Sequence, residues 1–415
     1  ERMKMSLLRN IFIGVAVIFG ATLAAYDYSS GINVKDFGAV GDGVADDTAA
    51  IRRAMSFART QVDQALLARQ PMLTGAPELG DLPILGSTSE NTIIPEVYFP
   101  AGTYRVTDTL VGSAFAVLRG DGDATIRMEV PDKDVFYFDW GYRIQFRGLE
   151  IDGGRRQIMV YTGNNDVANF TVEDCRFRNS TGPALWSHNP LRPGGHDFAT
   201  MTIGPYEVDF SGEVPVLTPN DVEQLPYYAN STNISVYGSR FEDCRQAFDL
   251  GADGVTVADC TVRVAPDSAP AAMRITGAVH LYRITGTAPA VTSARYWLEG
   301  YGNWSMEDSE FEKEGNAGMP LLYWPGQPRG ECTTALRLAR ARLNCAGSRE
   351  NAAVVIGNRD IECTPNYLDF EAVEERTGAT VAALAWEVPP TEERLRKSEF
   401  DQQPAVNLTG GAWTT

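Results

Sequence analysis

The sequence predicts an all-β solenoid with a helix at its N-terminal end, and three observations lead to this fold class. Short alternating apolar runs recur through the second half of the chain. Each run meets a two-residue turn and a second alternating run, with no helical periodicity between them. A single helical pattern lies near the N-terminus, where a solenoid would otherwise leave an open end.

The composition is that of a folded protein and limits its partners. The chain has 415 residues, of which 44% are hydrophobic and 22% charged, with a formal net charge of −18. A field of that sign argues against binding nucleic acid or an anionic membrane through bulk charge. A local basic pocket for an acidic substrate remains compatible with it. The acidic balance also makes Ca²⁺ a candidate cofactor, although no ordered ligand motif is present and the sequence requires no cofactor.

Residues 1–25 have the pattern of a targeting segment. Basic residues precede an apolar run of about 15 residues and two small residues, and a run of this length is shorter than the ~20 residues of a membrane span. A cleaved signal peptide and a retained N-terminal anchor both fit. The first predicts a secreted, periplasmic or extracellular protein, and the second a cell-surface protein with no other membrane contact. Six cysteines suit export but are too sparse for a disulfide scaffold.

The stretch "VKDFGAVGDGVADDTAAIRRAM", residues 34–55, predicts the start of the helix. A helix over about 46–69 would begin at Asp46 or Asp47, whose carboxylates can cap it. Its apolar stripe consists of Ala50, Ile51, Ala54, Met55 and Ala58. A phosphate loop is excluded because Gly-Lys-Ser/Thr is absent and four aspartates would repel phosphate.

The repeated runs predict the coils of the solenoid. The second apolar position of each run falls at Phe146, Val172, Val236, Val257, Met306 and Leu338. Four two-residue turns follow such runs: Asp174-Cys175, Gly238-Ser239, Asp259-Cys260 and Asp308-Ser309. One more coil, "AVHLYRITG", fits between Val257 and Met306, so the period is about 20–25 residues. Cys175 and Cys260 are then small residues that fill an inward corner.

Two stretches resemble the N-terminal signature of the pectate lyase superfamily. They are "VKDFGAVGDGVADDTAAI" and, at residues 97–126, "VYFPAGTYRVTDTLVGSAFAVLRGDGDATI". They are most similar to the "pectate lyase 3" type, which is related to polygalacturonases and tail-spike depolymerases. The resemblance implies a single-stranded right-handed parallel β-helix with an N-terminal capping helix. Trimers occur in relatives, so a homotrimer is a candidate assembly.

The β-helix is expected over residues 32–366, with a loop insertion at 189–232 and a C-terminal cap or tail at 367–415. The signature is specific for the fold but not for activity, because the family includes hydrolases, lyases, epimerases and non-catalytic glycan binders. The polygalacturonase motifs Asn-Thr-Asp, Gly-His-Gly and Arg-Ile-Lys are absent. No catalytic group is therefore carried over from the family.

Alignment of the third strands predicts a functional site. The segments "QIMVYTG", "GPALWSH", "RQAFDLG" and "PAAMRIT" place four residues inward, namely Met159, Leu185, Phe248 and Met273. The outward column then holds Val160, Trp186, Asp249 and Arg274. Because coils lie ~4.8 Å apart, the last three form a tryptophan platform beside an ion pair, as many sugar sites do. The alternative is a surface salt bridge beside a tryptophan that a loop covers.

The insertion leaves the solenoid directly after His188 and would line this site. We expect substrate contacts from Arg192, His196 and Tyr206, and from Asp253 in the next coil. Packing of the loop against the helix or a neighbouring subunit is an equal alternative.

Two mechanisms fit a polysaccharide substrate. A lyase acting on a uronate needs a cation, here Arg274, and a base such as His188, His196 or a tyrosine. Asp249 would orient the arginine or bind calcium. A hydrolase needs two carboxylates. Asp249 is one candidate, and its partner would be Asp253, Glu207 or Asp209, although no convincing pair of aspartates lies on adjacent coils.

The sequence therefore predicts an exported enzyme, a lyase or glycoside hydrolase, that degrades an acidic polysaccharide. The alternative is a non-catalytic β-helix that binds glycan or has a structural role at the cell surface.

Overall fold

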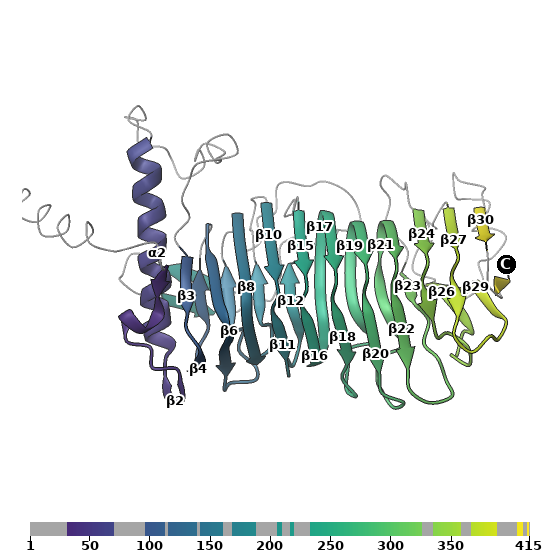
Figure 1. The fold of residues 1–415 in the computed structure, drawn as a ribbon, viewed down its shortest axis with the longest axis horizontal. Helices are drawn as coiled ribbons and strands as arrows, with labels where there is room; N and C mark the ends of the chain where they lie inside the picture. Colours follow the sequence, from purple (N-terminus) through teal and green to yellow (C-terminus); the bar gives the residue numbers. More distant parts are fainter. Residues whose placement is uncertain are drawn as a thin grey trace, which may run out of the picture.

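The computed structural model describes twelve segments of the chain: residues 31–69, 96–112, 115–138, 142–160, 168–187, 206–209, 216–219, 233–325, 335–357, 367–387, 405–409 and 413–414. They form a right-handed parallel β-helix, in which almost every strand pairs with the equivalent strand one coil further on. Figure 1 shows the coils stacked along one axis, with the helix α2 (Thr48–Arg69) at one end.

Each coil contributes to three faces, which we number in chain order. The first face contains β1 (Ile32–Asn33), β3 (Glu96–Phe99), β10 (Ala168–Glu173), β15 (Asn233–Tyr237), β24 (Ala335–Ala339), β27 (Tyr367–Glu371) and β30 (Ala405–Thr409). The second face contains β2 (Asp42–Asp46), β4 (Gly102–Val106), β11 (Arg176–Arg178), β16 (Arg240–Cys244), β18 (Thr261–Val264), β20 (Thr285–Ala288), β22 (Glu310–Lys313), β25 (Arg342–Leu343) and β28 (Glu374–Glu375).

The third face contains β5 (Leu110–Gly112), β7 (Phe136–Phe138), β9 (Ile158–Val160), β12 (Pro183–Ser187), β23 (Leu322–Trp324), β26 (Ala352–Ile356), β29 (Val381–Trp386) and β31 (Trp413–Thr414). Long strands bend from one face to the next. β6 (Val117–Met128) and β8 (Tyr142–Gly153) join the first face to the second. β17 (Gln246–Ala258), β19 (Ala271–Tyr282) and β21 (Tyr296–Glu307) join the third face to the first face of the next coil.

The capping helix covers the N-terminal end of the core, and Asp46 and Asp47 hydrogen-bond to its start and to the loop before it. Ala50, Ile51, Ala54, Met55 and Ala58 are all buried, which confirms the apolar stripe. The helix begins at Thr48, whose amide donates to Asp46 Oδ1 at 3.0 Å. Asp47 accepts hydrogen bonds from the amides of Val40 (2.6 Å) and Gly41 (3.0 Å). The two amides of this loop therefore donate their hydrogen bonds to the carboxylate of Asp47.

The register of the first face agrees with the repeat read from the sequence. Phe146 pairs with Val172, Val172 with Val236, Val236 with Val257, and Met306 with Leu338. The extra coil is also present, with Leu281 between Val257 and Met306. These side chains form one continuous core along the solenoid.

The two-residue turns between the first and second faces share one backbone conformation. Asp174, Gly238, Asp259 and Asp308 all have φ between 51 and 59°. The next residue of each turn is buried, and this confirms Cys175 and Cys260 as corner residues. The stacked coils thus repeat the same turn, in which the first residue has the left-handed backbone conformation.

The solenoid continues past the expected boundary at residue 366. β27 pairs in parallel with β24, β30 pairs with β27, and β31 pairs with β29. The described residues beyond 366 (367–387, 405–409 and 413–414) therefore form further coils of the solenoid. Leu338 and Phe370 are neighbours on adjacent coils although 32 residues separate them, compared with 24 between Val257 and Leu281. The longer loops obscured the period in the sequence.

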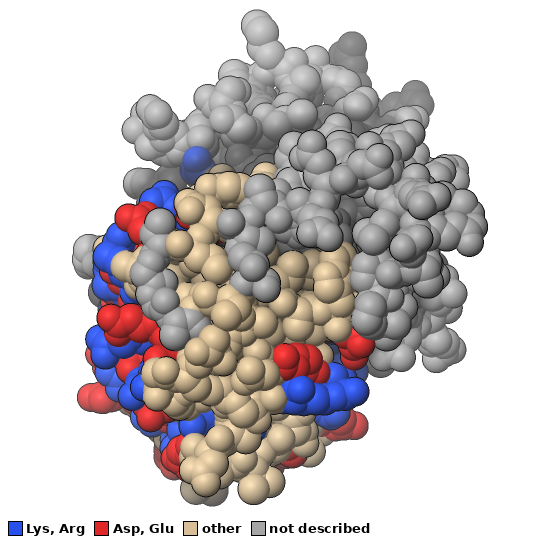
Figure 2. All heavy atoms as spheres, turned by 90° about the vertical axis from the view of Figure 1, so that its right-hand side faces the viewer, with Lys and Arg blue, Asp and Glu red and all other residues tan. Residues whose placement is uncertain are grey.

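Charge on the surface is mixed. In the end-on view of Figure 2, Lys and Arg lie among Asp and Glu along the edges of the described surface. Among the described residues, no helix has the length and apolar character that a membrane crossing requires.

Candidate functional site

One outward column runs along the third face, and its first eight coils, before Val355 and Ala385, contain the candidate site. In these coils it consists of Val111, Tyr137, Met159, Trp186, Asp249, Arg274, Glu299 and Tyr323. The first four of these residues are buried and the other four carry charge or a phenol. The change from apolar to charged side chains falls between β12 and β17.

The predicted register is right for three coils and wrong for one. Trp186 pairs with Asp249 and Asp249 with Arg274, as the alignment proposed. Met159, however, pairs with Trp186 and points outward, while its neighbour Val160 belongs to the core. A shift of one residue exchanges the two sides of a strand. Since Ile158, Met159 and Val160 are all apolar, the sequence could not decide between the two registers.

Trp186 is not an exposed sugar platform, and this part of the prediction is wrong. The residue is 6% exposed and packs with Val111, Tyr137 and Met159. Leu217 packs against the same cluster from β14 (Val216–Pro219). That strand forms an antiparallel hairpin with β13 (Tyr206–Asp209) inside the insertion. The hairpin covers the tryptophan, which is the alternative that the sequence left open.

Arg274 lies between two carboxylates on the third face. Its Nη1 is 3.2 Å from Asp249 Oδ2, and its Nε is 3.4 Å from Glu299 Oε1. The side chain of Arg274 is 40% exposed, against 10% for Asp249 and 23% for Glu299. The two acids thus hold a guanidinium group that solvent can still reach. Glu299 was missed because the alignment stopped one coil too early, at "PAAMRIT".

An aromatic cluster adjoins this group on the following coils. The rings of Tyr296 and Tyr323 stack with their centroids 4.6 Å apart and an interplanar angle of 19°. The Tyr323 hydroxyl donates to Glu387 Oε2 at 3.0 Å, and Arg295 Nη2 donates to the Tyr296 hydroxyl at 3.0 Å. Burial raises the pKa of Tyr296 to about 12, so this phenol keeps its proton at neutral pH. The sequence analysis did not identify this cluster.

Several predicted site residues cannot be placed. His188, Arg192 and His196 lie outside the described residues. The backbones of Tyr206 and Asp253 are described in β13 and β17, but their side chains are not. The roles of these five residues stay predictions.

Calcium binding also stays a prediction. Within the described ranges, no three side chains of the His, Cys, Asp and Glu types gather as they would around a metal ion.

The N-terminal part of the chain matches a known family. Residues 31–137 match the family model described as "Rhamnogalacturonase A/epimerase, pectate lyase-like". No curated protein matches the sequence. The coils define the chain as a right-handed parallel β-helix, and residues 31–137 are similar to this pectate lyase-like family. The resemblance inferred from the two N-terminal stretches is thereby confirmed.

The chain is also similar to solved structures of proteins of different kinds. The Streptococcus pneumoniae surface protein and adhesin PfbA is 13% identical, with 92% of this chain and 97% of that chain covered and a TM-score of 0.42. The A-module of the Azotobacter vinelandii mannuronan C-5 epimerase AlgE6 is 14% identical, with 92% and 99% covered and a TM-score of 0.39. ORF18 of Geobacillus virus E2 is 15% identical, with 93% and 59% covered and a TM-score of 0.31.

Proposed function

We propose that this protein binds and cleaves a polysaccharide containing uronate residues on the outer side of the third face. One observation carries the proposal: Arg274 is 40% exposed while Asp249 and Glu299 hold its guanidinium from two edges. An oriented guanidinium is suited to pair with a carboxylate through parallel hydrogen bonds. The pectate lyase-like match of residues 31–137 supports a carbohydrate partner.

Cleavage by β-elimination is the first candidate reaction. Arg274 would neutralise the uronate carboxylate, which makes the neighbouring ring proton easier to remove. A base takes that proton, its electron pair forms the C=C bond of an unsaturated uronate, and the bond to the leaving sugar oxygen breaks. The leaving oxygen takes a proton from water or from the protonated base and becomes the new reducing end. The predicted base, His188, follows directly after Ser187 in the chain, and Ser187 pairs with Leu250, the neighbour of Asp249. Tyr296 is a poor base because its pKa is raised.

Hydrolysis is the second candidate, and one observation favours it. Asp249 and Glu299 lie on two sides of Arg274, with Asp249 Oδ2 at 3.2 Å and Glu299 Oε1 at 3.4 Å from its guanidinium, so about the width of this group separates the two carboxylates. Inverting glycosidases hold their two carboxyl groups about 6.5–9.5 Å apart. In this reaction Glu299 would be the partner carboxylate of Asp249.

A substrate panel tests both reactions. Pectate, alginate, rhamnogalacturonan, hyaluronan and neutral glucans are incubated with the protein, with and without a calcium chelator. Ultraviolet absorbance of the unsaturated uronate and the appearance of reducing ends are followed together. We expect both signals to rise on a uronate-containing substrate and to fall by at least about a hundredfold in Arg274→Ala. Unchanged cleavage in this variant would place the active site elsewhere.

Glu299→Gln separates the two mechanisms. In a lyase, Glu299 competes with the substrate carboxylate for Arg274, so its neutralisation should lower KM and leave kcat within a few-fold. In a hydrolase, Glu299 is the acid or base, so kcat should fall by about 10²–10⁴ with little change in KM.

Export to the periplasm, the medium or the cell surface belongs to the same proposal, because a polysaccharide substrate of this kind lies outside the cytoplasm. Absence of cleavage on every substrate, with binding retained, would favour the non-catalytic glycan-binding alternative. The mass of the purified protein in solution tests the homotrimer.

A further inference from the structure

The first face carries an uncharged patch on three successive coils. We define the patch by Ser235 and Tyr237 on β15, Thr256 and Ala258 on β17, and His280 and Tyr282 on β19. Each strand presents one residue to each of two outward columns, and Figure 1 shows β15, β17 and β19 side by side. One column holds Ser235, Thr256 and His280, and the other holds the two tyrosines with Ala258 between them.

The same face is charged on both sides of the patch. Before it, Arg147 and Glu173 form an ion pair at 3.0 Å. After it, Arg340 pairs with Glu307 at 2.8 Å, and Arg337 pairs with Glu371 at 2.8 Å. In the column of the two tyrosines, charge is therefore interrupted over these three coils, in a chain whose net charge is −18. In the other column, Thr171 before the patch and Ser305 after it are uncharged as well. Tyr237 and His280 are exposed and Tyr282 is half-buried, and aromatic side chains that reach the surface of a charged protein in this way point to a binding role.

The two tyrosines are spaced for alternate units of an extended sugar chain. Tyr237 is 38% exposed, and it lies two coils from Tyr282, ~9.6 Å away at the backbone. This distance is close to the length of two pyranose units. Ala258 presents only a methyl group between the rings. Arg283, which pairs with Asp259, covers one face of the Tyr282 ring, with its guanidinium carbon 3.8 Å from the ring centroid. This ion pair borders the patch and leaves the other face of the ring for a sugar.

The second column supplies hydrogen-bonding groups without charge. The hydroxyls of Ser235 and Thr256 can each donate and accept, as sugar hydroxyls do. His280 is exposed, and its Nδ1 lies 2.8 Å from the hydroxyl of Ser305 on β21, which fixes the ring. Aromatic rings beside such groups match the two sides of a pyranose, its apolar ring face and its polar edge.

We propose that the uncharged patch is a second glycan-binding surface, which holds a neutral stretch of an extended polysaccharide chain. It lies on a different face of the solenoid from Arg274. The proposal does not rest on the proposed cleavage reaction, since binding here requires neither Arg274 nor the carboxylates beside it.

Calorimetric titration of the full chain with defined hexasaccharides tests the proposal. The probes are β-1,4-linked glucose, β-1,4-linked mannose and α-1,4-linked galacturonate. We expect at least one neutral hexasaccharide to bind, and the double variant Tyr237→Ala/Tyr282→Ala to bind it at least about tenfold more weakly. Tyr367→Ala is the matched control, because Tyr367 is 40% exposed on β27 of the same face but lies outside the patch. This control should retain wild-type affinity.

Three results would overturn the proposal. They are no binding of either neutral hexasaccharide by the wild type, equal affinity in the double variant and the wild type, or an equal loss in the Tyr367→Ala control. Arg274→Ala separates this surface from the proposed active site. Retained neutral binding with lost cleavage supports two surfaces, whereas loss of both in Arg274→Ala would assign them to one site and reject the patch. If the wild type binds a neutral hexasaccharide but cleaves no substrate, only the proposed cleavage reaction is rejected.

Discussion

Asp134 shows how one buried charge stabilises the third face. Its side chain is 0% exposed and accepts from Arg156 at 2.7 Å to each carboxylate oxygen, and from Arg155 at 3.1 Å. Burial alone would raise the pKa of Asp134, but the hydrogen bonds and charges of Arg156 and Arg155 outweigh it and lower this pKa. Arg156 also lies 5.6 Å from the Trp186 ring centroid. The acid therefore orders the arginine beside the covered tryptophan.

Asp134→Asn should lower the free energy of unfolding by about 3–5 kcal/mol at neutral pH, because Arg156 would keep a buried charge without its counter-charge. The lowered pKa means that the stabilisation is present above the unfolded-state value of about 3.9 and is lost as pH falls through the folded-state value. Denaturant unfolding at several pH values measures this, and the difference from wild type should shrink in acid.

An exposed ion pair at a turn, Asp259 with Arg283, provides a control for Asp134. Asp259 contacts Arg283 at 2.5 Å, but both side chains are nearly half exposed. Asp259→Asn should change stability little, since water screens this pair. A wild-type unfolding midpoint for Asp134→Asn would contradict the role assigned to the buried ion pair.

At the scale of the element, the long strands β17, β19 and β21 depend on glycine where they bend between faces. Gly277 has φ of 115°, and a Cβ at this position would lie 1.7 Å from the carbonyl oxygen of Ala252. Gly302 in the next coil would place a Cβ 2.0 Å from the oxygen of Gly277. The bends of adjacent coils are therefore in direct backbone contact, and they set how the third face meets the first.

Gly277→Ala should destabilise the protein by more than the about 1–3 kcal/mol that an unfavourable φ alone costs. The matched control is Gly378→Ala, because Gly378 has φ of 70° and no heavy atom lies within 4 Å of the place that a methyl group would take there. Thermal and denaturant unfolding of the two variants isolate the close approach. Equal losses of stability in both would show that the backbone contact at Gly277 is relaxed.

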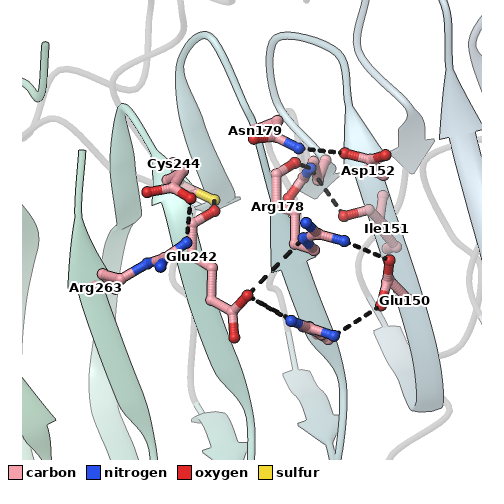
Figure 3. Close-up of polar contacts among 11 residues, drawn as sticks. Glu150, Ile151, Asp152, Arg178, Asn179, Glu242, Cys244 and Arg263 are labelled. Atoms are coloured by element: carbon pink, nitrogen blue, oxygen red, sulfur yellow. Dashed lines mark hydrogen bonds and ion pairs between the residues drawn. The ribbon is translucent and has the colours of Figure 1, made fainter. Parts of the chain in front are cut away.

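The second face uses alternating charge across coils. Figure 3 shows Arg178 between Glu150 of β8 and Glu242 of β16, and Arg176 pairs with the same two acids. Arg176 approaches Glu242 at 2.6 Å and Glu150 at 3.4 Å. Because Arg176 is 41% exposed, each pair contributes little to stability. Opposite charges across neighbouring strands instead favour this order and register of coils.

For the molecule as a whole, the continuous core makes buried thiols reporters of unfolding. Cys175, Cys244, Cys260 and Cys345 are free and buried. Burial raises the pKa of the Cys175 thiol to about 12 and that of Cys244 to about 11, so little thiolate forms at neutral pH. Both low accessibility and low thiolate content protect these four side chains in the folded state.

Alkylation followed by peptide mass spectrometry should label these four cysteines only as the protein unfolds. We expect the denaturant midpoint for their labelling to coincide with that for loss of β-structure by circular dichroism. Peptide resolution keeps Cys332 and Cys363, which lie outside the described residues, separate from the four. Labelling of Cys175 or Cys260 well below the unfolding midpoint would show that the coils open locally.

The sequence by itself determined the solenoid, its first-face register and the capping helix. The reason is that inward residues repeat at equivalent positions, Val236, Val257 and Met306 among them, and each must be apolar to join one core. The turns at Asp174 and Asp259 repeat for a similar reason, since each coil passes from the first face to the second at the same corner. The order of Trp186, Asp249 and Arg274 followed from the same period.

Only the tertiary structure decided which side chains of the site are accessible. Trp186 lies on the outer column, but a hairpin about thirty residues further along the chain covers it through Leu217. Such a contact leaves no periodic signal in the sequence. The side on which Met159 lies was equally hidden in a run of three apolar residues. The position of Arg274 between Asp249 and Glu299 depends on coil stacking, which brings together residues 25 positions apart.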